Sequence, residues 1–216
     1  MFITLEGTEG SGKTSQLIPL AEALSREGYH VFVTREPGGT PIGDQVRAIL
    51  SDLKNTDMQP RTEFLLFQSS RAQLVEQVIR PRLAQGELVL CDRYADSTVA
   101  YQGYGYQQLD LEQVRSIVQF ATGGLKPDLT ILLDVDVELG LRRKRQGGSE
   151  WNRLDDYEVA FYQRVRQAYL EMVRQEPERW VIIDATPPFD AVQAAIRAMV
   201  LERLRRVQIV KRGQPA

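Results

Sequence analysis

The feature that most constrains the fold of this chain is a run of eight residues near its start, Gly7-Thr8-Glu9-Gly10-Ser11-Gly12-Lys13-Thr14. It fits the pattern G-x-x-x-x-G-K-[ST], in which glycines let consecutive backbone N–H groups point inward and bind phosphate. Residues Phe2–Leu5 before it predict a short buried strand, and residues Gln16–Glu27 after it predict a helix. This context favours a nucleotide-binding α/β fold over the alternative, a glycine-rich turn with an incidental lysine.

The residue types in this loop also indicate its ligand. Lys13 can reach the β- and γ-phosphates of a nucleoside triphosphate, and the Thr14 hydroxyl can coordinate Mg²⁺. The N-terminus of the following helix adds partial positive charge. We therefore assign all eight residues, from Gly7 to Thr14, to the binding of a triphosphate and its magnesium ion.

The rest of the chain alternates between strand and helix patterns. This alternation predicts one three-layer α/β domain, in which helices cover both faces of a parallel sheet of about five strands. We place the domain at residues 1–205 and a basic C-terminal tail at residues 206–216. After the first strand, further strands are expected at His30–Thr34, Glu87–Cys91, Leu129–Leu133 and Trp180–Ile183.

Local signals mark the ends of several helices. Thr40 can cap a helix that has Pro41 at its first position, and Gly123 and Gly124 can end another helix. Pro19 falls inside the first predicted helix, where we expect a kink or a local distortion. An aspartate followed three residues later by Gln or Glu predicts further helix starts at Asp110, Asp155 and Asp190.

Composition excludes several classes of protein. The chain has 216 residues, with 27 basic and 29 acidic side chains, so no overall field attracts nucleic acid. A single cysteine, Cys91, allows no intrachain disulfide and suits a reducing cytoplasm. The sequence shows no signal peptide and no run of 18 apolar residues, so we expect no membrane partner. His30 is the only histidine, which excludes multi-histidine metal sites. It lies just before a predicted strand, beside Gly28 and Tyr29, and is expected at the surface, which argues against Ser-His catalysis.

A second group of charged residues, Asp92-Arg93-Tyr94, directly follows the apolar strand that ends at Cys91. Ligands of a parallel sheet bind beyond the carboxyl ends of its strands, so Asp92 is expected near the glycine-rich loop. A carboxylate there can help to hold magnesium, and Arg93 adds a cation for phosphate. The alternative is an Asp–Arg salt bridge at a strand end.

A third segment, Arg142-Arg143-Lys144-Arg145-Gln146-Gly147-Gly148-Ser149, places four cations before two glycines. Together with Arg153 it predicts a lid at about residues 142–153, meaning a segment that closes over bound nucleotides and brings arginines to their phosphates. A solvated basic helix face and a nucleic-acid patch are the alternatives. The candidates for contact with the transferring phosphoryl group are Arg143, Arg145 and Arg153.

Two further patterns could form a ligand site. Phe67 and Arg71 lie four residues apart and share a helix face, where a ring and a guanidinium could hold a nucleobase, although such an aromatic is more often core. The segment Tyr101-Gln102-Gly103-Tyr104-Gly105-Tyr106 is expected to be a loop at a ligand site or on the surface. The sequence offers clustered arginines and no candidate histidine base. An acceptor that is itself a phosphate is already ionised and needs no general base, so these patterns together indicate a nucleoside monophosphate kinase.

Together the motifs resemble the thymidylate kinase family over nearly the whole chain. The resemblance rests on the glycine-rich loop, the arginine-rich lid and five shorter segments: residues 34–40, 67–71, 92–94, 97–103 and 126–130. It implies the P-loop nucleoside monophosphate kinase fold, transfer of the ATP γ-phosphate to dTMP to give dTDP, and a homodimer. The open alternatives are a kinase for another monophosphate and a regulatory nucleotide switch. The switch is disfavoured because Leu125-Lys126-Pro127-Asp128 lacks the first residue of the guanine-reading [NT]-K-x-D pattern.

The resemblance also implies roles for individual residues. Phe67 stacks on thymine, Arg71 and Gln102 contact the base, and Tyr101 crowds the 2′ position. The acceptor phosphate and sugar are then bound by Glu9, Arg93, Arg35, Pro37 and Ser97, and magnesium is placed by Thr14 and Asp92.

The family has two arrangements of its catalytic arginine, one in the phosphate loop and one in the lid. Gly10 follows Glu9 where the first arrangement has arginine, so this chain resembles the lid type. It departs from that type at Gly147, where a third alternating arginine is frequent, and at Asn152-Arg153-Leu154-Asp155, where D-R-x-E is more usual.

Overall fold

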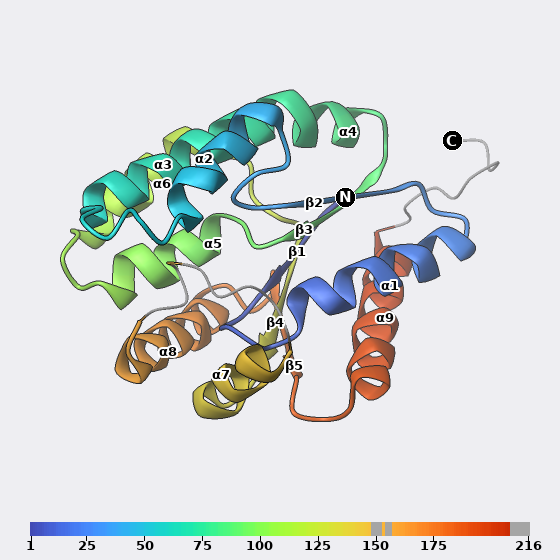
Figure 1. Ribbon diagram of the computed structural model, residues 1–216. Coiled ribbons are helices and arrows are strands. Elements are labelled where there is room, and N and C mark those ends of the chain that lie inside the picture. The colour runs from blue at the N-terminus through green and yellow to red at the C-terminus, as the bar shows by residue number, and fades with distance from the viewer. Residues whose placement is uncertain (148–152, 154–156, 208–216) are drawn as a thin grey trace.

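The computed structural model describes residues 1–147, 153 and 157–207. Its centre is a five-stranded parallel sheet with the strand order β2-β3-β1-β4-β5 (Figure 1). The sheet confirms the predicted α/β class, and every strand end lies within one residue of its expected position. The strands are β1 (Phe2–Glu6), β2 (Val31–Arg35), β3 (Leu88–Asp92), β4 (Leu129–Asp134) and β5 (Trp180–Asp184).

One face of the sheet is covered by α1 (Lys13–Arg26) and α9 (Phe189–Arg206), which pack against each other. Their buried residues form one apolar cluster with Ile3 and Leu5 of β1. Phe2 belongs to a separate cluster that includes Leu74, the last residue of α3. Successive side chains of a strand point to opposite faces of the sheet, so β1 contributes to the core on both of its sides.

The other helices lie against the opposite face of the sheet and beyond the carboxyl ends of its strands (Figure 1). None of the helices within the described ranges is long and apolar enough to cross a membrane. Besides α1 and α9, the helical elements are α2 (Pro41–Ser51), α3 (Pro60–Leu74), the π-helical turn η1 (Val75–Ile79), α4 (Arg80–Ala84), α5 (Ala95–Thr98), the π-helical turn η2 (Val99–Gly105), α6 (Leu111–Thr122), α7 (Val137–Gln146) and α8 (Val159–Gln175).

The predicted helix caps are partly correct. The Thr40 side chain accepts a hydrogen bond from the Gly43 amide, and Asp110 caps α6 in the same way. The predicted cap at Asp190 is wrong: α9 begins at Phe189 after Pro188, so Asp190 lies in the first turn, where its charge suits the helix dipole. Asp155 lies outside the described residues. The first helix, α1, continues through Pro19 to Arg26.

The prediction of a loop at the tyrosine- and glycine-rich residues 101–106 is also wrong, because Val99–Gly105 form η2 directly after α5. Its glycines serve close packing. A Cβ atom at Gly105 would lie 2.6 Å from the Phe161 ring of α8, and one at Gly103 would lie 3.0 Å from Leu111. Small residues here let two helices approach η2, which a turn-based interpretation of glycine does not anticipate.

Candidate active site

The glycine-rich loop joins β1 to α1 and wraps around its own lysine. Gly7, Gly10 and Gly12 have φ angles of 144°, 68° and 93°, a region that L side chains rarely adopt. The buried Lys13 Nζ donates hydrogen bonds to the carbonyls of Gly7 (2.9 Å) and Thr8 (2.8 Å). The ammonium group is therefore fixed at the N-terminus of α1, where a phosphate would bind.

From the environment of Lys13 we expect phosphate binding to depend on pH. Burial, followed by the charge of Arg93, lowers the pKa of Lys13 to about 8. The ammonium form is present below this pKa and is lost above it. We therefore expect kcat/KM for a nucleoside triphosphate to fall as pH rises through about 8, whereas kcat at saturating triphosphate stays level because bound phosphate stabilises the ammonium. Steady-state pH profiles test this, and a kcat/KM that stays level to about pH 9.5 would contradict it.

Asp92 ends β3 beside the loop, as the parallel sheet predicts, because Leu5 of β1 is paired with Asp92 in register. The Thr14 hydroxyl donates a hydrogen bond to Asp92 Oδ2. Asp92 Oδ1 is buried and has no hydrogen-bond partner in the described part of the chain. The Thr14 hydroxyl and the Asp92 carboxylate thus place oxygens side by side, and one of them, Asp92 Oδ1, has no partner among the described residues. This arrangement fits a magnesium ion, which binds to few protein ligands. The described ranges contain no group of three or more His, Cys, Asp or Glu side chains that could hold a metal ion.

Arg93 connects the end of β3 with the loop. Its backbone adopts a φ of 65°, which is unusual for a residue other than glycine and turns the side chain back toward β1. Nη1 donates to the Gly7 carbonyl (3.1 Å) and to Ser97 Oγ (3.2 Å), and Nη2 donates to Glu9 Oε1 (2.7 Å). The Tyr101 hydroxyl donates to the other oxygen of Glu9 at 2.7 Å. The structure thus brings four predicted acceptor-site residues into one network.

A buried carboxyl group that the sequence interpretation missed, Glu6, supports this turn. It accepts hydrogen bonds from the Tyr94 amide (2.8 Å), Ser97 Oγ (2.5 Å) and the Tyr169 hydroxyl (2.9 Å). Burial, followed by the charge of Asp96, raises the pKa of Glu6 to about 7. The available signal was an acid at the end of an otherwise apolar strand.

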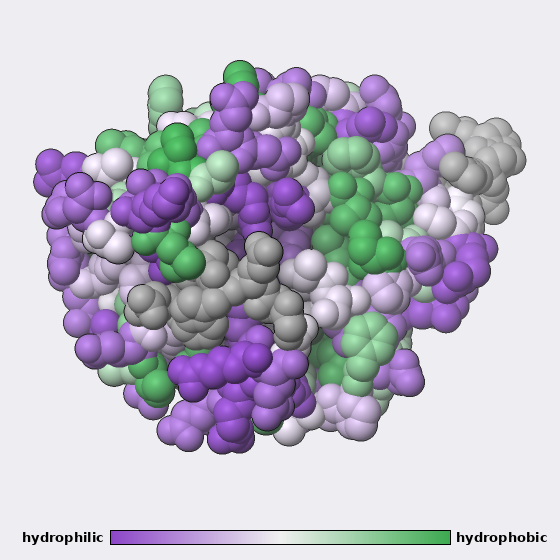
Figure 2. Space-filling view, viewed as in Figure 1, coloured by the Kyte–Doolittle hydropathy of each residue, from purple (hydrophilic) through white to green (hydrophobic). Residues whose placement is uncertain are grey.

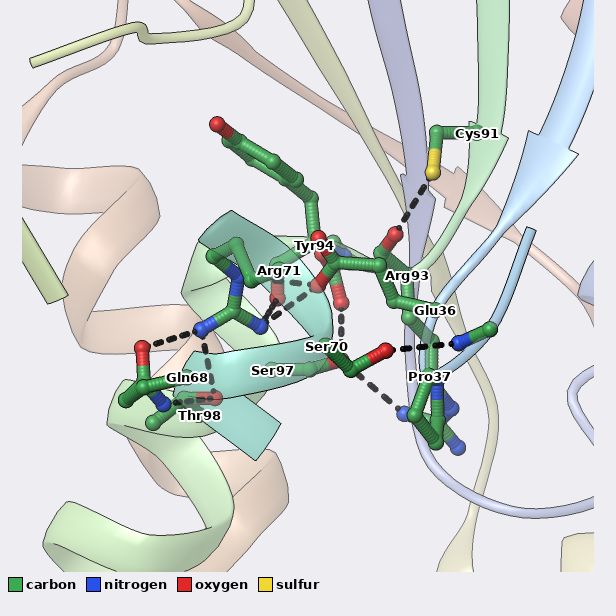
Figure 3. A network of polar contacts seen from close by, with 12 residues as sticks. Glu36, Pro37, Gln68, Ser70, Arg71, Cys91, Arg93, Tyr94, Ser97 and Thr98 are labelled. Atoms are coloured by element: carbon green, nitrogen blue, oxygen red, sulfur yellow. Dashed lines mark hydrogen bonds and ion pairs between the residues drawn. The ribbon is translucent and has the colours of Figure 1, made fainter. Parts of the chain in front are cut away.

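Arg71 is fully buried, and Figure 3 shows it surrounded by acceptors. Nε and Nη2 donate to Glu36 Oε2 at 2.9 and 2.6 Å, and Nη2 also donates to the Tyr94 carbonyl at 3.1 Å. Nη1 donates to Gln68 Oε1 (2.7 Å) and Thr98 Oγ1 (3.0 Å). A guanidinium has five N–H groups, so contact with a base requires one of these bonds to be shared or exchanged.

A cavity of about 560 Å³ is lined by the glycine-rich loop, the residues after β3 and the side chains of α3 and η2. Figure 2 shows hydrophilic residues in a hollow near the middle of the face in view. Glu63, which the sequence interpretation missed, also lines the cavity. The spacing Glu63–Phe67–Arg71, four residues each on α3, was the available signal. The predicted site residues that line the cavity are Glu9, Gly10, Gly12, Lys13, Thr14, Arg35, Pro37, Phe67, Arg71, Asp92, Arg93, Ser97, Tyr101, Gln102 and Arg143.

The three candidate lid arginines lie in different places. Arg143 lines the cavity and donates to the carbonyls of Ala185 (2.6 Å) and Thr186 (2.7 Å) after β5. Arg145 is exposed on α7 and is not among the described lining residues. Arg153 Nη2 forms an ion pair with Glu63 at 2.6 Å. Residues 148–152 of the expected lid lie outside the described residues.

The helix that carries Arg143 rests directly on the glycine-rich loop. A Cβ atom at Gly10 would lie 1.8 Å from the Gly140 carbonyl, and one at Gly140 would lie 2.4 Å from the Glu9 carbonyl. Only two residues without side chains allow this approach of α7 to the loop. The sequence interpretation gave Gly140 no role.

The fold and the cavity define a class of protein: the P-loop nucleoside monophosphate kinases, in which a glycine-rich loop and strand-end charges face one cleft. The particular family follows from comparison with known proteins. The model of the thymidylate kinase family matches residues 5–196, and the chain belongs to this family.

Individual relatives agree over almost their full length. The thymidylate kinase of Roseiflexus castenholzii is 51% identical, with 93% of this chain and 92% of the relative covered. That of Deinococcus radiodurans is also 51% identical, with 94% and 97% covered. The crystal structure of thymidylate kinase from Ehrlichia chaffeensis superposes with a TM-score of 0.74 at 34% identity, covering 94% of this chain and 98% of that chain.

Proposed function

We propose that this protein transfers the γ-phosphate of ATP to dTMP, giving dTDP, with Mg²⁺ as the metal ion. The observation that carries the proposal is the single cavity that Lys13 and Thr14 of the phosphate loop share with Phe67 and Gln102. Arg93 contacts both the loop, through Gly7, and the Ser97 side of the cavity. A donor phosphate and an acceptor phosphate would meet at this arginine.

The chain supplies positioning and positive charge. The acceptor oxygen of a monophosphate is already ionised, so no general base is required. Lys13, Arg93 and Arg143 line the cavity and would neutralise the phosphates. Thr14 and Asp92 would hold magnesium, which would supply positive charge to offset that of the phosphates.

Phosphorylation of a panel of monophosphates tests the proposal: dTMP, dUMP, UMP, dCMP, AMP and GMP, each with Mg-ATP. We expect ADP formation to be dominated by dTMP. Preference for another nucleotide would keep the chemistry and overturn the base assignment. The absence of acceptor-dependent turnover would favour a regulatory nucleotide switch.

Selection of deoxyribose is expected to depend on Tyr101. Its ring packs edge-on against Phe161 and Tyr169, and its hydroxyl is held by Glu9. We expect Tyr101→Phe to release the ring from Glu9 and to lower the preference for dUMP over UMP by about tenfold, the effect of losing one hydrogen bond of about 1.4 kcal/mol. The ratio of the two kcat/KM values measures this, and an unchanged ratio would reject the assignment.

We also propose that the protein forms a homodimer. Three neighbouring helices, α2, α3 and α6, each expose a large apolar side chain: Ile49 (47% exposed), Leu65 (46%) and Phe120 (87%). Burial of such groups against a second copy would stabilise association. Light scattering on the purified protein measures the oligomeric state.

A cytoplasmic location is also proposed, and it is compatible with a buried Cys91 that forms no disulfide.

A further inference from the structure

Glu63 of α3 places a carboxylate in the interior beside the cavity. Its side chain is 1% exposed, and it accepts four hydrogen bonds. Oε1 accepts from Gln102 Nε2 (2.9 Å) and the Tyr106 hydroxyl (2.8 Å). Oε2 accepts from Arg153 Nη2 (2.6 Å) and the Tyr157 hydroxyl (3.1 Å). All four donors come from segments distant in sequence, so the carboxylate joins α3 to η2, to Tyr106 after it and to residues before α8.

The contact with Glu63 fixes the orientation of the Gln102 amide. Carboxylate oxygens accept hydrogen bonds and donate none, so the NH₂ group of Gln102 must face Glu63. Gln102 itself lines the cavity with Phe67 and Arg71. Within the described part of the chain, no hydrogen bond reaches Gln102 Oε1. The amide therefore has its NH₂ group directed to Glu63 by one of its two N–H bonds, and its carbonyl is available.

An available carbonyl distinguishes pyrimidine bases. Thymine and uracil carry a proton on N3 and donate a hydrogen bond there, whereas N3 of cytosine accepts one. We propose that Glu63 is a positioning residue that sets base selectivity: it holds the Gln102 carbonyl as an acceptor for a base with an N3–H group and so excludes cytosine. This inference rests on the proposed function, because it assumes that the base of the acceptor lies against Gln102.

Arg153 has a supporting part in this arrangement. Its guanidinium pairs with Glu63 and also donates from Nε to the Leu50 carbonyl at 2.9 Å. This ion pair fixes the position of the Glu63 carboxylate beside the Gln102 amide.

The decisive variant is Glu63→Gln, which keeps the shape of the side chain but offers both a donor and an acceptor. Either orientation of the Gln102 amide can then be satisfied. We expect the ratio of kcat/KM for dTMP over dCMP to fall by about tenfold or more, because the pocket no longer mismatches cytosine. The ratio for dTMP over dUMP should stay constant, since both bases carry N3–H.

Tyr106→Phe is the matched control. It removes another donor to the same Glu63 oxygen and leaves the Gln102 contact in place. Its dTMP over dCMP ratio should stay within about twofold of the wild-type ratio, as expected for a bond that does not contact the base. A parallel loss of both activities in Glu63→Gln, with an unchanged ratio, would show a merely structural role and overturn the proposal.

A second variant, Gln102→Leu, covers the case in which Glu63→Gln fails to fold. It removes the amide, so dTMP should lose its advantage over dCMP, and an unchanged ratio would also overturn the proposal. In the double variant, Glu63→Gln should lower the ratio no further, because it acts through Gln102. Failure of the proposed function would be distinct, since the wild-type protein would then not turn over dTMP.

Discussion

Replacing Arg93 with alanine is expected to lower kcat/KM for dTMP by on the order of 10³-fold, while ATP affinity falls by less than about tenfold. The guanidinium is held by Glu9 and Ser97 in the region that the acceptor phosphate would occupy. Arg93 contacts the phosphate loop through the Gly7 carbonyl, to which Lys13 also donates, and through Glu9, which the Tyr101 hydroxyl also holds. The loop should therefore keep its shape without Arg93.

Two measurements check this result: turnover with varied dTMP, and equilibrium binding of ATP by calorimetry. Arg93→Lys is the control, because it keeps the charge and loses the planar fork, and an intermediate activity is expected. Equal losses of turnover and ATP affinity would instead assign Arg93 a structural role in the loop.

The second large effect is expected from Gly140→Ala. The added methyl group would lie 2.4 Å from the Glu9 carbonyl, which is backbone and cannot rotate away. Either α7 or the phosphate loop must shift, and overpacking of this kind costs about 1–3 kcal/mol of stability. We expect kcat to fall by about 10²-fold, because Arg143 moves with the helix relative to the loop.

Thermal unfolding and steady-state kinetics measure the two parts of this prediction. Glu138→Ala on the exposed side of the same helix is the control and should change kcat by less than about twofold. Wild-type kcat and stability in Gly140→Ala would show that the helix and the loop adapt to each other without cost.

The sequence was sufficient for features that depend on local order. The sheet, the loop before Lys13 and the placement of Asp92 follow from alternating patterns and from the rule that parallel strands end at one edge. Arg93 was expected near phosphate for the same reason. These inferences need neighbouring residues and chain direction, and no knowledge of how the helices pack.

Contacts between distant residues could not be derived in this way. The pairs Glu63–Gln102 and Gly10–Gly140 form because helices, and in the second pair a helix and the glycine-rich loop, meet from separate parts of the chain. Glycine was misleading in η2, where Gly105 provides space for α8 rather than a turn. The complete pairing of Arg71 was also not expected, since the residues that accept from it come from four separate elements or loops.

That pairing of Arg71 has an energetic consequence. A long side chain loses about 1–2 kcal/mol of rotamer freedom when it is immobilised. Here Glu36, Gln68, Thr98 and the Tyr94 carbonyl already restrict the guanidinium during folding. A nucleotide would therefore bind to a pocket wall that is already ordered. The loss of entropy on ordering this arginine lowers the stability of the folded protein and does not weaken the binding of ligand.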